Sequence, residues 1–183
     1  MFSFGKTSLA QIVHLQPDLK AIITEALSIS PIDYGVLYLG GARTAEEQHD
    51  LWLQGRFGHE GKIVTDKDGH TNPSNHQIKP DGLGYAVDVV PFMGGKPTWS
   101  WEWIFPMIRA IGQVARDKGV SLRWGGVWDR KLEELDLDAL EAEVHAYTQR
   151  HPGPDHIDGP HLEYLGMIAA PTPAPKEIGR AHV

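Results

Sequence analysis

The sequence predicts an α+β fold: a small, mainly antiparallel sheet packed by about four helices. Two patterns support this prediction, namely apolar residues that recur at helical spacing and short runs of branched and aromatic residues that end at glycine or proline. With 183 residues, 41% of them hydrophobic, the chain can bury one core. We expect one domain over residues 1–166 and a flexible tail, rich in alanine and proline, over 167–183.

The first part of the chain contains two predicted helices with a strand between them. Apolar residues at four positions from 19 to 26 share one helical face and predict a helix over 18–28. Residues 34–39 have the composition of a buried strand. Thr44, with Glu47 three positions later, forms a capping-box pattern that predicts a helix over 44–54.

A long polar stretch separates these elements from the next strand. Residues 55–80 are rich in glycine and polar side chains, so we expect a loop with at most a short strand at Ile63-Val64. A loop of this length in a small domain is usually functional or disordered. Residues 85–91 alternate as a strand that stops at a proline, and Asp88 lies within it.

The remaining elements follow in close succession. A stripe of apolar residues, closed by Lys118-Gly119, predicts the central packing helix over 101–118. Residues 120–124 predict a strand, 136–149 an amphipathic helix, and 161–165 a short strand.

Composition excludes several classes of function. A formal net charge of −7 and a pI near 5.8 provide no basic surface for nucleic acid. The chain has no cysteines, so a metal ion would need nitrogen and oxygen ligands. The N-terminus has no signal-peptide pattern, and no apolar run approaches the ~20 residues of a membrane span, so we expect a chain made in the cytoplasm without membrane insertion.

Two distant segments contain residues suited to a metal site. His76 follows the polar loop, and Asp88 is flanked by apolar residues that would make its burial costly without a cation or donors. Further along, His161 and Glu163 are two apart on an extended segment and can share a face. Two histidines and an aspartate would hold zinc with one position open for water, and a neighbouring carboxylate would take the proton.

The residues alone also allow interpretations without this metal site. Most single histidines are surface or hydrogen-bonded residues, and the alternative for Asp88 is that it faces solvent or accepts bonds from turn amides. His156 is a second candidate for the place of His161. The metalloprotease pattern H-E-x-x-H is absent, because His59-Glu60 is not followed by a histidine at the required spacing.

Several short motifs, taken in order, resemble one family. It is the zinc D,D-peptidase and L-alanyl-D-glutamate peptidase family, which includes bacterial D-Ala-D-Ala carboxypeptidases and phage endolysins. The motifs are Gly41-Ala42-Arg43-Thr44 with Glu47-Gln48, Ser74-x-His76, Gly84-Tyr85-Ala86-Val87-Asp88, Trp124-Gly125-Gly126 and Asp158-x-x-His161-x-Glu163.

The resemblance implies a role for each matching position. It assigns one Zn²⁺ to His76, Asp88 and His161, and the general base to Asp158, where many members have glutamate. Arg43 would steady the substrate carbonyl or oxyanion, as an always-charged fork of donors can. Ser74 and Gln48 would contribute to substrate binding. For Arg43, a surface ion pair with Glu46 or Glu47 is the alternative.

One departure from the family pattern concerns spacing. The family usually has six residues between its first histidine and the aspartate, whereas eleven separate His76 from Asp88. We expect a proline-glycine turn within residues 77–84 that either bulges outward or reshapes the substrate groove.

The function expected from the resemblance is zinc-dependent hydrolysis of peptidoglycan by a phage endolysin, at the L-Ala-D-Glu bond of the stem peptide. Such an enzyme would act as a monomer on the cell wall after holin-dependent release. The alternatives are a D-Ala-D-Ala carboxypeptidase or dipeptidase and, in another class, a wall-binding or phage structural module with architectural zinc.

Overall fold

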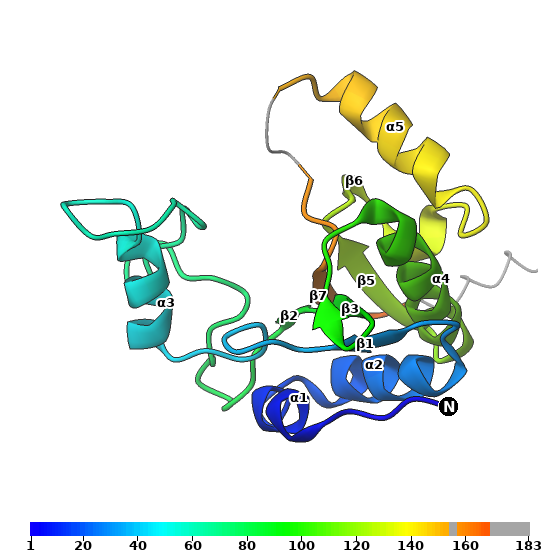
Figure 1. The fold of residues 1–183 in the computed structure, drawn as a ribbon, viewed down its shortest axis with the longest axis horizontal. Helices are drawn as coiled ribbons and strands as arrows, with labels where there is room; N and C mark the ends of the chain where they lie inside the picture. The colour runs from blue at the N-terminus through cyan, green and yellow to red at the C-terminus, as the bar shows by residue number, and fades with distance from the viewer. Residues whose placement is uncertain (154–156, 169–183) are drawn as a thin grey trace, which may run out of the picture.

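The computed structural model describes residues 1–153 and 157–168, and these form an α+β fold with five α-helices and two small antiparallel sheets (Figure 1). The helices are α1 Lys6–Gln11, α2 Pro17–Ile29, α3 Ala45–Leu53, α4 Trp101–Asp117 and α5 Leu140–Arg150, with a short 3-10 helix, η1, at Leu132–Glu134. The predicted fold class is confirmed. Among the described helices, none is both long enough and apolar enough to span a membrane.

The larger sheet has the strand order β2-β7-β5-β6, and the smaller sheet has the order β1-β3-β4. Their strands are β1 Asp33–Gly35, β2 Ala86–Asp88, β3 Val90–Met93, β4 Lys96–Pro97, β5 Val120–Trp124, β6 Val127–Lys131 and β7 His161–Met167. Strand β7 pairs with β2 on one side and β5 on the other, although β2 is far from it in sequence. This pairing brings residues 86–88 beside 161–163.

The core lies between the sheets and two long helices, α2 and α4, which pack against each other (Figure 1). The apolar stripes predicted on these helices are buried: Ile22 and Ile23 of α2 and Ile108 and Ile111 of α4 are fully inaccessible. Trp124 of β5 is also fully buried and donates its indole N–H to the Gly159 carbonyl at 2.7 Å. The core therefore anchors the segment that precedes β7.

A lobe formed by α3 and the loop over residues 54–73 projects from the body of the molecule (Figure 1). The predicted capping box is present, because Glu47 N donates to Thr44 Oγ1 at 3.1 Å and Thr44 N to Glu47 Oε2 at 2.8 Å. The loop folds around Asp68, whose carboxylate accepts from the amides of His70 and Asn72. These local bonds organise a long segment without strands, and no strand forms at Ile63-Val64.

The boundaries of three predicted elements are wrong. The strand expected over 34–39 ends at Gly35, because Leu39 has a positive φ of 62° and Gly40 N closes a turn onto Leu37 O. The strand expected over 85–91 divides at Val89, whose amide donates to Pro160 O instead of to a neighbouring strand. The helix expected over 136–149 begins only at Leu140.

The late start of α5 has a local cause. Asp136 Oδ1 accepts from the backbone N–H of Asp138 at 2.9 Å, and this side-chain bond competes with the first helical turn. Helix α1, the short helix η1 and strands β4 and β6 were not predicted. At the other end, β7 runs to Met167 and the Ile168 amide donates to Gly119 O, while residues 169–183 lie outside the described part.

Candidate active site

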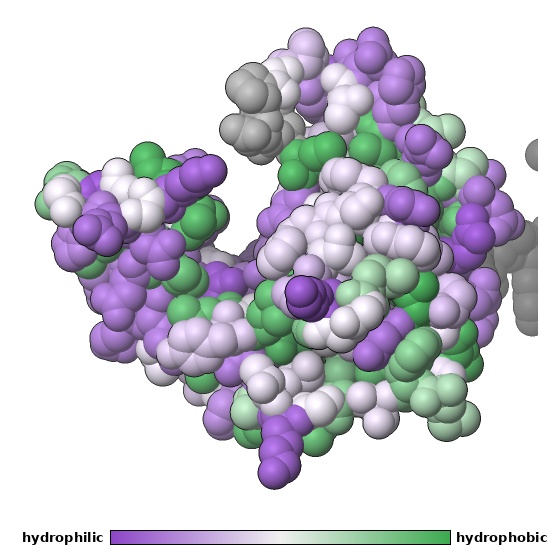
Figure 2. Space-filling model, viewed as in Figure 1, coloured by the Kyte–Doolittle hydropathy of each residue, from purple (hydrophilic) through white to green (hydrophobic). Residues whose placement is uncertain are grey.

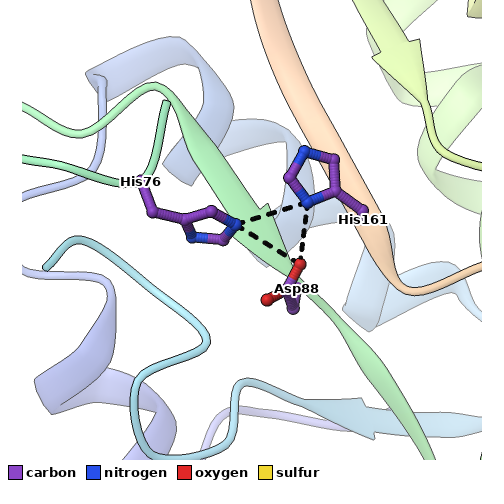
Figure 3. Close-up of side chains that lie close together, drawn as sticks. All are labelled: His76, Asp88 and His161. Atoms are coloured by element: carbon purple, nitrogen blue, oxygen red, sulfur yellow. Dashed lines mark hydrogen bonds and ion pairs between the residues drawn. The ribbon is translucent and has the colours of Figure 1, made fainter. Parts of the chain in front are cut away.

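The three candidate ligands converge on one point (Figure 3). Asp88 Oδ1 lies 3.0 Å from His161 Nδ1 and 3.4 Å from His76 Nε2, and the two histidine nitrogens are 3.3 Å apart. The three residues come from positions 76, 88 and 161, so the fold brings together what the sequence separates. This triangle of two nitrogens and one oxygen can hold a metal ion.

Sheet pairing positions two of these side chains. Asp88 on β2 and His161 on β7 are register partners, so they lie directly opposite each other. His76 comes from the loop that precedes β2. Its carbonyl accepts from Arg43 N at 2.9 Å, and its amide donates to Ser74 Oγ at 3.2 Å. Ser74 therefore helps to hold the loop that carries His76.

The second ring nitrogen of each histidine has its own partner. His76 Nδ1 lies 2.9 Å from the Gly41 carbonyl, and His161 Nε2 lies 3.3 Å from Glu163 Oε1. These partners fix which nitrogen of each ring faces the cluster. Gly41 itself packs against the Gln11 backbone, where only glycine fits, because a Cβ would lie 1.9 Å from Gln11 O.

Glu163 is a site residue whose role the sequence did not reveal. Its predicted common face with His161 is confirmed by the 3.3 Å contact. The carboxylate also accepts from Asn75 Nδ2 at 2.8 Å and pairs with Arg123 at 3.3 Å. Burial alone would raise the pKa of Glu163, but the bonds from His161 and Asn75 lower it to about 2. Glu163 is thus a charged acceptor that orients the His161 ring.

Charge within the cluster is strongly coupled. Burial opposes ionisation of Asp88, yet the adjacent His76 and His161 hold the pKa of its carboxyl well below the usual value. For His161, burial alone would lower the pKa, while hydrogen bonds to Asp88 and Glu163 raise it to about 10. Without a metal ion, a proton on His161 therefore compensates the carboxylates.

Arg43 is buried beside this cluster and is not part of a surface ion pair. Its NH2 group pairs with Asp88 Oδ2 at 3.1 Å, its NH1 group donates to Gln48 Oε1 at 3.0 Å, and its Nε donates to Leu39 O. Three of the five guanidinium N–H donors are thereby engaged. Burial lowers the pKa of Arg43, and the charges on Asp88 and Asp158 act in the opposite direction.

Gln48 does not have the predicted place in the cleft, and this expectation is corrected. Its side chain is fully buried and spans from Arg43 to the loop, where its Nε2 donates to Lys67 O at 2.9 Å. A group without exposed surface cannot touch a substrate. Gln48 instead connects Arg43 to the lobe.

Asp158 lies near the cluster on the segment that leads into β7. Burial around its carboxyl raises its pKa, Asp88 adds to the rise, and the nearby His161, His76 and Arg43 oppose it. The residue as a whole is exposed to the cleft, so solvent screens part of these effects.

The Trp124-Gly125-Gly126 motif has a structural role in placing Asp158. Asp158 N donates to Gly125 O at 2.8 Å, and Gly125 N donates to His161 O at 2.9 Å. A Cβ at Gly125 would lie 2.2 Å from Asp158 O. Only glycine therefore permits β5 to lie this close to residues 158–161.

The site lies between two cavities, each of about 390 Å³. Figure 2 shows a notch between the lobe and the body of the molecule. Both cavities are lined by the five residues Arg43, Val64, Thr65, Asp88 and Asp158, so together they form a cleft with the site in its middle. His76, His161, Ser74 and Glu163 line one side only.

The extra residues between His76 and Asp88 form a turn away from this cleft. Lys79 N donates to Leu83 O at 2.9 Å and Gly82 N to Lys79 O at 2.8 Å, which closes the turn on itself. Of the two alternatives predicted for this segment, these contacts agree with the outward bulge. Of the described residues that line the two cavities, none falls within 77–84.

Two histidines and an aspartate, with a further aspartate beside them in an open cleft, are the arrangement of a metal-dependent hydrolase. The chain belongs to the phage L-alanyl-D-glutamate peptidase family, whose family model matches residues 1–165. It is 27% identical over 129 residues to the L-alanyl-D-glutamate peptidase of Escherichia phage T5, a match that covers 70% of this chain and 82% of the relative.

The fold also resembles that of a solved structure, the L-Ala D-Glu endopeptidase ChiX of Serratia marcescens. The TM-score is 0.52 at 21% sequence identity, and the match covers 90% of each chain. Similarity at this level supports the fold, and the family match identifies the chain as a peptidase.

Proposed function

We propose that this peptidase is a phage endolysin that uses one zinc ion to hydrolyse the L-Ala-D-Glu bond of the peptidoglycan stem. The observation that carries the proposal is the triangle of His76 Nε2, Asp88 Oδ1 and His161 Nδ1, with sides of 3.0 to 3.4 Å. Tetrahedral zinc bound at about 2.0–2.2 Å places neighbouring ligand atoms about 3.3 Å apart. The donor set, two imidazoles and a carboxylate, also suits zinc.

The groups around the ligands support a catalytic centre. His76 and His161 each have a partner on the second ring nitrogen, as ligand histidines almost always do. When bound, zinc supplies Lewis acidity that polarises a carbonyl and lowers the pKa of water towards ~7. A purely architectural zinc would need a fourth protein ligand. His156, the other histidine considered in this segment, lies outside the described residues.

Asp158 would serve as the general base. Its carboxylate lines the cleft on both sides of the cluster, where it can accept a proton from the attacking water and deliver it to the leaving amine. The raised pKa of Asp158 makes its carboxylate a stronger base, which favours the first of these transfers. Asp158 is placed by the close approach of Gly125 described above.

Arg43 would have two roles. Its bond to Asp88 Oδ2 fixes the ligand carboxylate, which leaves Oδ1 towards the histidines. The two N–H donors that have no partner among the described residues are available to the scissile carbonyl, because Arg43 lines both cavities. Ser74 lines the polar cavity and would contribute to substrate binding there.

The shape of the cleft favours an endopeptidase over a carboxypeptidase. Cavities extend on both sides of Asp88 and Asp158, which suits a chain that continues past the cleaved bond in both directions. The proposal further includes action as a monomer on the bacterial wall, after synthesis in the host cytoplasm and holin-dependent release. Its basis is membership of a phage peptidase family.

Mass spectrometry of purified peptidoglycan digested by the enzyme tests the proposal directly. New N-terminal D-Glu is the expected result, whereas release of D-Ala would identify a carboxypeptidase and contradict the assigned bond. Metal analysis in parallel should give about one zinc per chain. An unchanged zinc content in a His76→Ala, His161→Ala double variant would contradict the ligand assignment.

A further inference from the structure

The two sides of the cleft differ in chemical character. The side near β3 is lined largely by apolar and aromatic residues, among them Tyr38, Leu51, Val90 and Trp99. The side near His76 is lined by polar groups, including Lys67, Ser74 and Asn75. A substrate that crosses the site therefore meets two unlike surfaces, and its two halves are not interchangeable.

Among the described residues that line the polar side, Lys67 is the lysine whose ammonium has no carboxylate partner. Arg43, which also lines this cavity, is paired with Asp88, and the His161 ring contacts Asp88 and Glu163. Lys67 Nζ contacts only a neutral group, Asn72 Oδ1, at 2.9 Å, and within residues 1–153 and 157–168 no carboxylate lies within ion-pair distance of it.

The backbone that carries Lys67 is held firmly. Its carbonyl accepts from the buried Gln48 side chain at 2.9 Å, and its amide donates to Thr65 Oγ1 at 3.1 Å. Through Gln48, this backbone is connected to Arg43 and so to Asp88. The backbone of Lys67 is therefore fixed relative to the catalytic groups, while the Lys67 side chain is exposed.

The chemistry of the bond in the proposed function supplies a matching anion. Within a peptide, a D-glutamate residue uses its amino group and one carboxyl group in the chain and keeps the other as a carboxylate. The alanine on the opposite side of the bond carries only a methyl group. One half of the substrate is thus negatively charged near the cleaved bond, and the other half is neutral.

We propose that Lys67 binds the free carboxylate of the D-glutamate residue and thereby sets the direction of the substrate in the cleft. The glutamate half lies on the polar side with Ser74 and Asn75, and the alanine half lies along Tyr38 and Trp99. This inference rests on the proposed function. Lys67 is then a specificity residue, because its exposed ammonium interacts with the charge of the substrate and does not contact the cleaved bond.

The test uses two matched stem peptides that differ only at this group: one contains D-glutamate, and the other contains the corresponding amide, D-isoglutamine. The wild-type enzyme should cleave the acid with a kcat/KM about fivefold to tenfold above that of the amide, as expected for one partly exposed charge pair. Lys67→Met should lower the acid rate to the amide rate and leave the amide rate unchanged. Lys67→Arg should keep most of the preference.

Lys62→Met is the matched control, because Lys62 is an exposed lysine of the same lobe that lines neither cavity. It should retain the full preference for the acid, and thermal unfolding should show that all variants fold. A Lys67→Met enzyme that still prefers the acid would overturn the inference, as would a wild type that cleaves both peptides equally. Cleavage of neither peptide by the wild type would overturn the proposed function itself.

Discussion

Asp88 and His161 are direct partners in the antiparallel pairing of β2 with β7, and their side chains meet with 3.0 Å between Oδ1 and Nδ1. This contact depends on strand register. If one strand slipped by one residue relative to the other, the two side chains would point to opposite faces of the sheet. The sheet therefore provides two thirds of the candidate metal site, and the contacts of His76 with Gly41 and Arg43 complete it.

Metal binding should release a proton and should strengthen as the pH rises. The pKa of His161 is about 10 without metal, whereas a ligand imidazole must be neutral. Between pH 6 and 8, zinc binding should therefore release about one proton per ion and tighten about tenfold per pH unit. Calorimetry in two buffers of different ionisation enthalpy measures the proton count.

The same pKa predicts how the metal-free protein responds to pH. Because folding raises the pKa of His161 above about 6.5, its contribution to stability is fully present below that pH and is lost as the pH rises towards about 10.

For the calorimetric experiment, zinc binding without proton release would contradict the assigned protonation of His161. His14→Ala, at an exposed histidine away from the cluster, should leave the proton count unchanged.

Replacement of Asp158 should separate catalysis from metal binding. Asp158→Ala should retain one zinc per chain but lose about 10²–10⁴-fold in kcat, because a general base contributes about that factor. Zinc analysis and the hydrolysis rate of the same preparation give both values. Retained activity would remove Asp158 as the base, and loss of zinc would make it a ligand.

Neutralisation of Glu163 should weaken the metal site without removing a ligand. Glu163→Gln keeps the shape of the side chain but lowers its strength as the acceptor of the His161 N–H. The zinc affinity should fall about 10–100-fold, as is typical when such a supporting partner is changed. Competition with a chelator measures this affinity.

Glu143→Gln is a matched control for that experiment. Glu143 is also a largely covered carboxylate paired with an arginine, but it lies on α5, outside both cavities of the cleft. Its replacement should leave zinc affinity unchanged. Equal losses in both variants would indicate general destabilisation and would contradict the specific role of Glu163.

The turn between His76 and Asp88 should be dispensable for cleavage. Asp81→Ala removes the bonds that Asp81 accepts from Leu83 N and Tyr85 OH, yet kcat/KM should stay within about twofold, since surface changes away from a site have small effects. Asn75→Ala, only six positions earlier, removes a donor to Glu163 and should reduce activity. A changed substrate preference in Asp81→Ala would restore the turn as a specificity element.

The sequence was sufficient for the features that depend on local patterns. Helices α2, α3 and α4 follow from apolar spacing and from the Thr44 capping box, and each forms within two residues of the predicted limits. The extended geometry that places His161 and Glu163 on one face was equally predictable, because alternation along a strand is a local property.

Features that depend on distant contacts could not be predicted in the same way. Residues 34–39 have strand composition, but a positive φ at Leu39 and a turn at Gly40 end the strand early. Gln48 was assigned to substrate from its motif, although its neighbours in space bury it completely. The roles of Gly41 and Gly125 depend on close approach to Gln11 and Asp158, which no local pattern encodes.

The place of β7 in the larger sheet has a consequence for when activity can arise. This strand carries His161 and Glu163, follows every other described strand in the chain, and yet lies between β2 and β5. During synthesis, a ribosome-bound chain that lacks residues beyond 160 has neither a completed sheet nor a third ligand. Nascent chains should therefore carry no lytic activity until β7 has emerged and inserted between its neighbours.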